Sequence, residues 1–143
     1  MVLEDGRWDE FLKVGERFGF RGRVSNPAGF ARRTRVLLVR HEPSGLDVDV
    51  VVAGLPFEKE LLERGATVVV GGVSTPVCSA EDLIILKAVA GRARDWGDIE
   101  GVLDANPGLD RERVRRWVEQ FAAALEAPEI MEHIEKLLAL RPT

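Results

Sequence analysis

Residues 34–53, TRVLLVRHEPSGLDVDVVVA, decide the fold class of this chain. Two largely apolar runs, at 34–41 and 46–53, flank the turn-forming residues around Pro43 and Gly45. Apolar runs of this length, bounded by proline and glycine, are typical of strands joined as a hairpin. The stretch therefore predicts a β-hairpin.

Further elements are expected before and after this hairpin. The evidence for them is apolar residues at helical spacing, prolines at helix starts, and the two-residue turn sequence Gly71-Gly72. The elements expected in the first part are helices at 7–18, 27–32 and 56–64, a strand at 20–24, and a second hairpin with strands at 67–70 and 73–77.

The second part of the chain is expected to be helical. Ser79, followed three residues later by Asp82, has the form of a capping box and predicts a helix to about residue 90. Further helices are expected at about 94–104, after Asp110 and after Pro128. Apolar stripes along the last two predict that they pack as a C-terminal helical hairpin. The predicted fold class is therefore α/β (α+β).

Composition limits the class of protein. The 143 residues contain no evident linker or repeat, so we expect one domain, with a sheet-containing part at 1–78 and a helical part at 79–143. One cysteine, Cys78, excludes an intramolecular disulfide. Neither a signal peptide nor an apolar run of about 18 residues is present. We therefore expect a cytoplasmic protein without a membrane partner.

The charge distribution leaves two interpretations open. A net charge of −4 argues against general nucleic-acid binding. Between Glu16 and Glu42, however, there is no acidic residue. The same segment contains seven arginines: Arg17, Arg21, Arg23, Arg32, Arg33, Arg35 and Arg40. These arginines are either a surface for phosphates or RNA, or a solvated face.

Asp47 and Asp49 are candidate metal ligands. They are two residues apart on a predicted strand, so both point to the same face. Carboxylates on an otherwise apolar strand are costly unless solvated, paired or metal-bound. They are therefore either ligands of a hard cation such as Mg²⁺ or the solvated end of a hairpin strand.

Lys87 is the second unusual residue, because it is the only charge in the apolar helical run 83–90. A helix that is apolar all round is usually buried. The Lys87 ammonium therefore needs either a phosphate or carboxylate partner lining a site, or a path to solvent along its own stem.

Two segments carry a resemblance to a known family: GLDVDVVVAGLPFEKELLERG at 45–65 and VCSAEDLIILKAVAGRARDWGDIEGVL at 77–103. They resemble bacterial nucleotidyltransferase-like proteins related to abortive-infection toxins and minimal nucleotidyltransferases. The resemblance implies a mixed β-sheet flanked by helices, with three carboxylates that bind Mg²⁺. Two come from an Asp-x-Asp pair after a Gly-Gly or Gly-Ser turn, and the third from a later strand.

The resemblance also assigns residues of this chain to roles. Asp49 matches the third carboxylate, and Asp47 matches it less closely, so both are expected as metal-binding and catalytic residues. Lys87 matches a lysine near the nucleotide or the acidic site, with a catalytic or nucleotide-binding role. Arg92, in the same stretch, is expected to bind the nucleotide.

The chain departs from the family pattern at one point. The Gly-Gly turn and its Asp-x-Asp pair are expected upstream of the first helix, yet Met1 lies where that motif strand would be ending. Gly71-Gly72 is not followed by an Asp-x-Asp. We therefore expect a truncated nucleotidyltransferase-like fold with an incomplete active site.

Two functions follow as hypotheses. The first is transfer of a nucleoside monophosphate from an NTP to an RNA or protein acceptor with Mg²⁺, if missing N-terminal residues complete the site; a role as a toxin belongs to this hypothesis. The second is a non-catalytic remnant that binds a partner or forms a homodimer, because a sheet that lacks strands exposes an edge.

Overall fold

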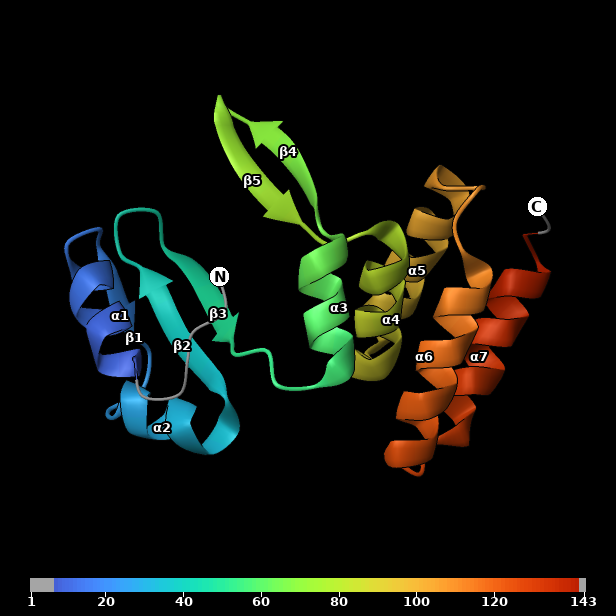
Figure 1. The fold of residues 1–143 in the computed structure, drawn as a ribbon, viewed down its shortest axis with the longest axis horizontal. Coiled ribbons are helices and arrows are strands. Elements are labelled where there is room, and N and C mark those ends of the chain that lie inside the picture. Colours follow the sequence, from blue (N-terminus) through green and yellow to red (C-terminus); the bar gives the residue numbers. More distant parts are fainter. Residues whose placement is uncertain (1–6, 142–143) are drawn as a thin grey trace. The chain divides into compact units, whose positions relative to one another are not determined.

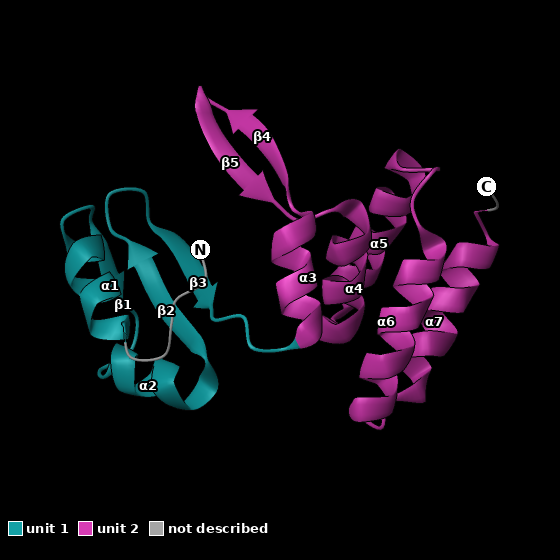
Figure 2. Ribbon diagram, viewed as in Figure 1, with its two compact units in different colours: residues 1–55 teal, residues 56–143 magenta. Residues whose placement is uncertain are grey.

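A computed structural model describes residues 7–141 and divides the chain into two compact units, residues 1–55 and residues 56–143 (Figure 2). Unit 1 and unit 2, as we call them, each have their own hydrophobic core. The prediction that residues 1–143 act as one domain stays a prediction. The boundary between the two units follows Leu55.

Unit 1 is a three-stranded antiparallel sheet with two helices (Figure 1). Its strand order is β1-β2-β3. In chain order its elements are α1 (Trp8–Glu16), β1 (Phe20–Gly22), α2 (Pro27–Thr34), β2 (Val36–His41) and β3 (Leu46–Val51).

The alternation of side chains along β2 gives the sheet of unit 1 one covered face. Leu37 and Val39 are buried in a core with Trp8 of α1 and with Ala31 of α2. Leu38 and Arg40 are on the opposite face, because successive side chains of a strand alternate. In the register of β2 and β3, Leu38 is opposite Asp49 and Arg40 is opposite Asp47. The two aspartates therefore share the face that the core does not cover.

Unit 2 is a group of helices with a two-stranded antiparallel hairpin (Figure 1). Its elements are α3 (Pro56–Arg64), β4 (Ala66–Val70), β5 (Val73–Val77), α4 (Ala80–Ala90), α5 (Ala93–Ala105), α6 (Arg111–Ala124) and α7 (Pro128–Ala139).

Local capping explains where two helices of unit 2 begin. The Ser79 side chain accepts a hydrogen bond from the backbone N–H of Asp82 (3.2 Å), which is the N-cap half of a capping box, whereas Asp82 Oδ1 pairs with Arg113. Asp110 likewise accepts from the N–H of Arg113 (3.0 Å). Both caps agree with the sequence-based prediction.

The α/β fold class and the C-terminal helical hairpin of α6 and α7 are confirmed. The strands of the described residues lie in two separate antiparallel sheets, whereas the resemblance implied one mixed sheet. For the pairs β2–β3 and β4–β5 the physical reason lies in the connections, because each pair is joined by a short turn, and a tight turn can only join antiparallel strands. Among residues 7–141, no helix has both the length and the hydropathy that crossing a bilayer requires.

Candidate functional site

The β3 carboxylates belong to an ionic cluster on the open face of unit 1. Arg40 Nε donates to Asp47 Oδ1 (2.7 Å), and Arg23 Nη1 donates to Asp47 Oδ2 (3.1 Å). Arg23 also pairs with Asp49. We call Arg23, Arg40, Asp47 and Asp49 the β3 cluster. Its carboxylates are exposed, with 41% of the Asp47 side chain and 58% of the Asp49 side chain accessible to solvent.

The backbone explains why these four side chains meet. Arg40 and Asp47 are directly opposite each other in the β2–β3 register. The N–H of Arg23 donates to the carbonyl of Leu38 (3.0 Å), and Leu38 is opposite Asp49. Arg23, Leu38 and Asp49 therefore form one row across the sheet, and neighbouring rows bring all four charged groups onto one face.

The arginines keep the β3 cluster ionised. The hydrogen bond from Arg40 lowers the pKa of Asp47, and the charge of Arg23 lowers it further. The same hydrogen bond raises the pKa of Arg40. Both shifts favour the charged forms of Asp47 and Arg40.

The β3 cluster supplies only part of a metal site. Carboxylate oxygens are suitable ligands for Mg²⁺. Yet within the part of the chain that the structure describes, no group of three or more His, Cys, Asp or Glu residues could hold a metal ion. Both Asp47 and Asp49 also contact Arg23. A cation at this position would have two protein carboxylates and would compete with a guanidinium.

A hollow of about 490 Å³ adjoins the β3 cluster. Gly22, Arg23, Arg40 and Glu42 line it. Its two guanidiniums are the donors that phosphate groups bind best, because their planar N–H pairs match phosphate oxygens. The hollow and the cluster together offer both a cationic surface and carboxylate oxygens.

Lys87 and Arg92 belong to a second ionic cluster, in unit 2. Lys87 Nζ is 2.6 Å from Asp98 Oδ2 and 3.5 Å from Asp95 Oδ1. Arg92 binds Asp95 through both Nε (2.5 Å) and Nη2 (3.2 Å). We call Lys87, Arg92, Asp95 and Asp98 the α4–α5 cluster. Lys87 thus has carboxylate partners, which was one of the two interpretations of its position.

The pKa values of the α4–α5 cluster follow from these contacts. The hydrogen bond with Asp98 raises the pKa of Lys87, and that with Arg92 lowers the pKa of Asp95. These shifts favour the charged forms of Lys87 and Asp95. The structure brings Asp47 and Asp49 together in unit 1. In unit 2, Lys87 and Arg92 both contact Asp95. That all four serve one site stays a prediction.

Sequence reasoning missed a third ionic group, which we call the Arg113 network. Arg113 is only 4% exposed and donates to Asp82 Oδ1 through Nε (2.9 Å) and to Glu60 Oε2 through Nη1 (2.6 Å). Trp117 Nε1 donates to the same Glu60 oxygen (3.3 Å). One available signal was that Arg113 precedes Trp117 by four residues, which puts it on the apolar face of its helix. The network joins α3, α4 and α6.

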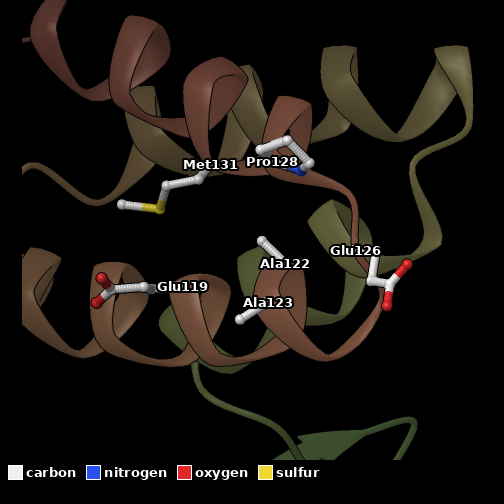
Figure 3. A pocket seen from close by; sticks show the side chains of 6 residues that line it. All are labelled: Glu119, Ala122, Ala123, Glu126, Pro128 and Met131. Carbon is white, nitrogen blue, oxygen red and sulfur yellow. The ribbon is translucent and has the colours of Figure 1, made fainter.

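A further hollow, of about 440 Å³, lies between α6 and α7 (Figure 3). Its lining is largely apolar, with the carboxylates of Glu119 and Glu126 on either side of Ala122 and Ala123 in the view of Figure 3. The charged residues of its lining are these two glutamates, with no cationic side chain among the lining residues to offset a triphosphate, so this hollow is unsuited to an NTP. The hollow beside the β3 cluster is the better candidate for a nucleotide.

Comparison with known proteins gives a family match that covers the α4–α5 cluster and, of the β3 cluster, every residue except Arg23. A family described as "Nucleotidyl transferase of unknown function (DUF2204)" matches residues 25–136, which include Asp47, Asp49, Lys87 and Arg92. A search of curated proteins found no match to the sequence. The family match covers well over half of the 143 residues and agrees with the resemblance seen in the two quoted segments. The chain therefore belongs to this nucleotidyl transferase family.

Proposed function

We propose that the protein binds an NTP at the β3 cluster and takes part in nucleotidyl transfer to an RNA or protein hydroxyl. The observation that carries the proposal is the family match, which implies a nucleotide substrate and includes both β3 aspartates. Nucleotidyl transfer depends on holding phosphates in place and on neutralising their charge. The β3 cluster has groups of both signs for this purpose.

The arginines of the cluster would bind the phosphates. Arg23 and Arg40 line the adjoining hollow and already hold anions, namely the β3 carboxylates. A bound Mg²⁺ ion would add the positive charge that offsets the phosphates. Asp47 and Asp49 would hold it, and their guanidinium partners could then turn to the phosphate oxygens. Exposed ion pairs exchange partners at little cost, which supports this role.

Lys87 and Arg92 are proposed as further nucleotide contacts. Both are within the family match, and Arg92 has an exposed side chain. Each already contacts Asp95, which is 1% exposed. Their replacement would therefore disturb the α4–α5 cluster as well as any nucleotide contact, so they are poorer first tests than the β3 aspartates.

Calorimetry with each Mg-NTP tests the proposal. We expect heat with at least one of MgATP, MgGTP, MgCTP and MgUTP, and an affinity at least about ten-fold weaker for Asp49→Asn, since that change removes one ligand charge. The matched control is Asp9→Asn, because Asp9 is also exposed in unit 1 and also pairs with an arginine, Arg32 (3.0 Å). Equal binding by the wild type and both variants, or no binding, would contradict the proposal.

Transfer itself needs a separate assay. Protein incubated with an NTP labelled at the α-phosphate should pass the label to added RNA or to protein, and Asp49→Asn should reduce this transfer. Nucleotide binding without any transfer would limit the function to binding.

A non-catalytic binding module is the second candidate function. The observation that favours it is the hairpin β4–β5, whose valines are largely exposed. Partner binding through this hairpin is compatible with nucleotide binding at the β3 cluster, because the hairpin and the cluster share no residue. Only the absence of transfer distinguishes this candidate from the first.

A further inference from the structure

The hairpin β4–β5 exposes an unusual amount of apolar surface. Residues 66–78, ATVVVGGVSTPVC, contain no charged side chain. Val69 is 71% exposed, and Val70 and Val73 are each 64% exposed. In Figure 1 the hairpin extends away from the helices of its own unit. Because a two-stranded hairpin alone is marginally stable in water, this one is an incomplete sheet.

The turn fixes which backbone groups face outward. Gly71 (φ 58°) and Gly72 (φ 82°) both have positive φ, as a two-residue type I′ turn requires. Such a turn closes on a hydrogen-bonded pair, here Val70 and Val73. Hydrogen-bonded and non-hydrogen-bonded pairs alternate along an antiparallel hairpin. The non-hydrogen-bonded pairs are therefore Val69 with Ser74 and Thr67 with Pro76.

The two outer edges of the hairpin differ. Pro76 occupies a position whose backbone N–H would face outward on β5, and proline has no N–H. A proline at an edge is one of the devices that prevent strand addition. On β4, Thr67 and Val69 each have both an outward N–H and an outward C=O group. Strand addition is therefore blocked at β5 and open at β4.

We infer that β4 pairs with β4 of a second copy of this chain, antiparallel, to form a four-stranded sheet. With Val68 opposite Val68 of the second copy, Thr67 is opposite Val69 of that copy. These are the two residues of β4 whose N–H and C=O groups face outward, so each such pair exchanges two hydrogen bonds. The register repeats under a two-fold axis, as an isologous dimer requires.

The lack of charge also favours a second copy as the partner. Edge strands usually carry charges that repel an identical strand, and β4 has none. The edge strand β3 of unit 1, in contrast, carries Asp47 and Asp49. The sequence predicted a homodimer through an exposed sheet edge, and we propose β4 as that edge. The inference is independent of the proposed nucleotide binding.

Oligomeric state as a function of concentration is the first test. A five-residue strand pair buries less than a standard interface, so we expect a dissociation constant on the order of 10–100 μM. Sedimentation equilibrium of the full chain between about 5 and 500 μM should show the monomer–dimer transition. A strict monomer throughout this range would overturn the inference.

Two proline variants identify the edge. Val69→Pro removes an outward N–H from β4, and Ser74→Pro removes one from the facing position on β5. We expect Val69→Pro to weaken dimerisation at least about ten-fold and Ser74→Pro to leave it unchanged, since only the β4 edge forms hydrogen bonds across the dimer. Loss of the dimer in Ser74→Pro alone would contradict the inference.

A cross-link test does not depend on whether the proline variants keep the hairpin. In the proposed register the Val68 pair lies on the two-fold axis at a Cα separation of about 4.5 Å, which is within the range of a disulfide. In a Cys78→Ser background, Val68→Cys should therefore form a disulfide-linked dimer under mild oxidation. Thr75→Cys, at the facing position on β5, should not. Equal cross-linking of the two variants, or none with Val68→Cys, would overturn the inference.

Discussion

The β3 cluster and the Arg113 network use the same arginine–carboxylate chemistry at opposite degrees of burial. In the β3 cluster the carboxylates of Asp47 and Asp49 are 41% and 58% exposed. In the Arg113 network, Asp82 is fully buried and Arg113 nearly so. Water can replace a lost partner of the β3 carboxylates, and of Glu60, whose side chain is 40% exposed, but not of the buried Asp82. Burial therefore separates an ionic group that can exchange its partners for a ligand from one that holds helices together.

The pKa values within the Arg113 network agree with a structural role. Burial alone would lower the pKa of Arg113, but its hydrogen bonds with Glu60 and Asp82 outweigh that effect and raise it. The hydrogen bond from Arg113 also lowers the pKa of Glu60. Arg113 and Glu60 therefore stabilise each other's charged form, so removing one of them affects the other.

The largest expected effect is the loss of Arg113. Arg113→Ala leaves the Asp82 carboxylate buried without its partner, which should lower the free energy of unfolding by about 3–5 kcal/mol. Arg115→Ala is the matched control, since Arg115 is on the same helix and also pairs with two carboxylates, of Glu112 and Glu135. It is more exposed, and its loss should cost about 1 kcal/mol or less. Urea denaturation of both variants measures the difference; equal losses would remove the distinction between the two groups.

The next effect concerns partner exchange in the β3 cluster. Arg23→Gln removes the guanidinium that competes with a cation for the carboxylates of Asp47 and Asp49. The variant should therefore bind Mn²⁺ roughly five-fold more tightly than the wild type does. Arg32→Gln is the control, because Arg32 pairs with Asp9 in the same unit. Electron paramagnetic resonance of free Mn²⁺ measures the affinity. An unchanged or weaker affinity in Arg23→Gln would show that the arginine does not compete for these carboxylates.

The smallest effect is a pH dependence of stability. The folded pKa of Asp47 is below its ordinary value of 3.8, so its contacts stabilise the fold above about pH 4 and are lost as the pH falls through the folded pKa. Wild type and Asp47→Asn should therefore differ by about 1–3 °C in Tm at pH 6, and the difference should shrink as the pH falls from about 4 towards 2. Thermal unfolding followed by circular dichroism across this range measures it. A difference that persists unchanged at pH 2 would exclude ionised Asp47 as its cause.

Local sequence patterns were sufficient to predict the order of elements. Gly71-Gly72 specified a hairpin turn, and the caps at Ser79 and Asp110 specified two helix starts. Each of these depends on residues within four positions of one another, so neighbouring sequence contains the necessary information. Helix ends were less accurate: the first helix was expected at 7–18 and is Trp8–Glu16.

The ionic groups required information that local patterns lack. The pair of Arg40 and Asp47 follows from a hairpin register and could have been derived. Arg23 and Asp49 are 26 positions apart, and Arg113 and Asp82 are 31 positions apart. Which distant segments meet depends on the packing of whole elements. The candidate residues Asp47, Asp49, Lys87 and Arg92 were therefore identified without their partners, and their roles stay predictions.

The hairpin β4–β5 leaves and re-enters unit 2 between two well-anchored helices. On one side, Phe57 of α3 packs edge-on against Trp117 (5.2 Å between ring centroids), and Glu60 binds Arg113. On the other side, Ile84 and Ile85 of α4 are fully buried in the helical core. Mutations between Arg64 and Ser79 therefore leave these anchors untouched. The hairpin can therefore change in length or sequence, and with it the association proposed for this chain, while the helices that flank it keep their packing.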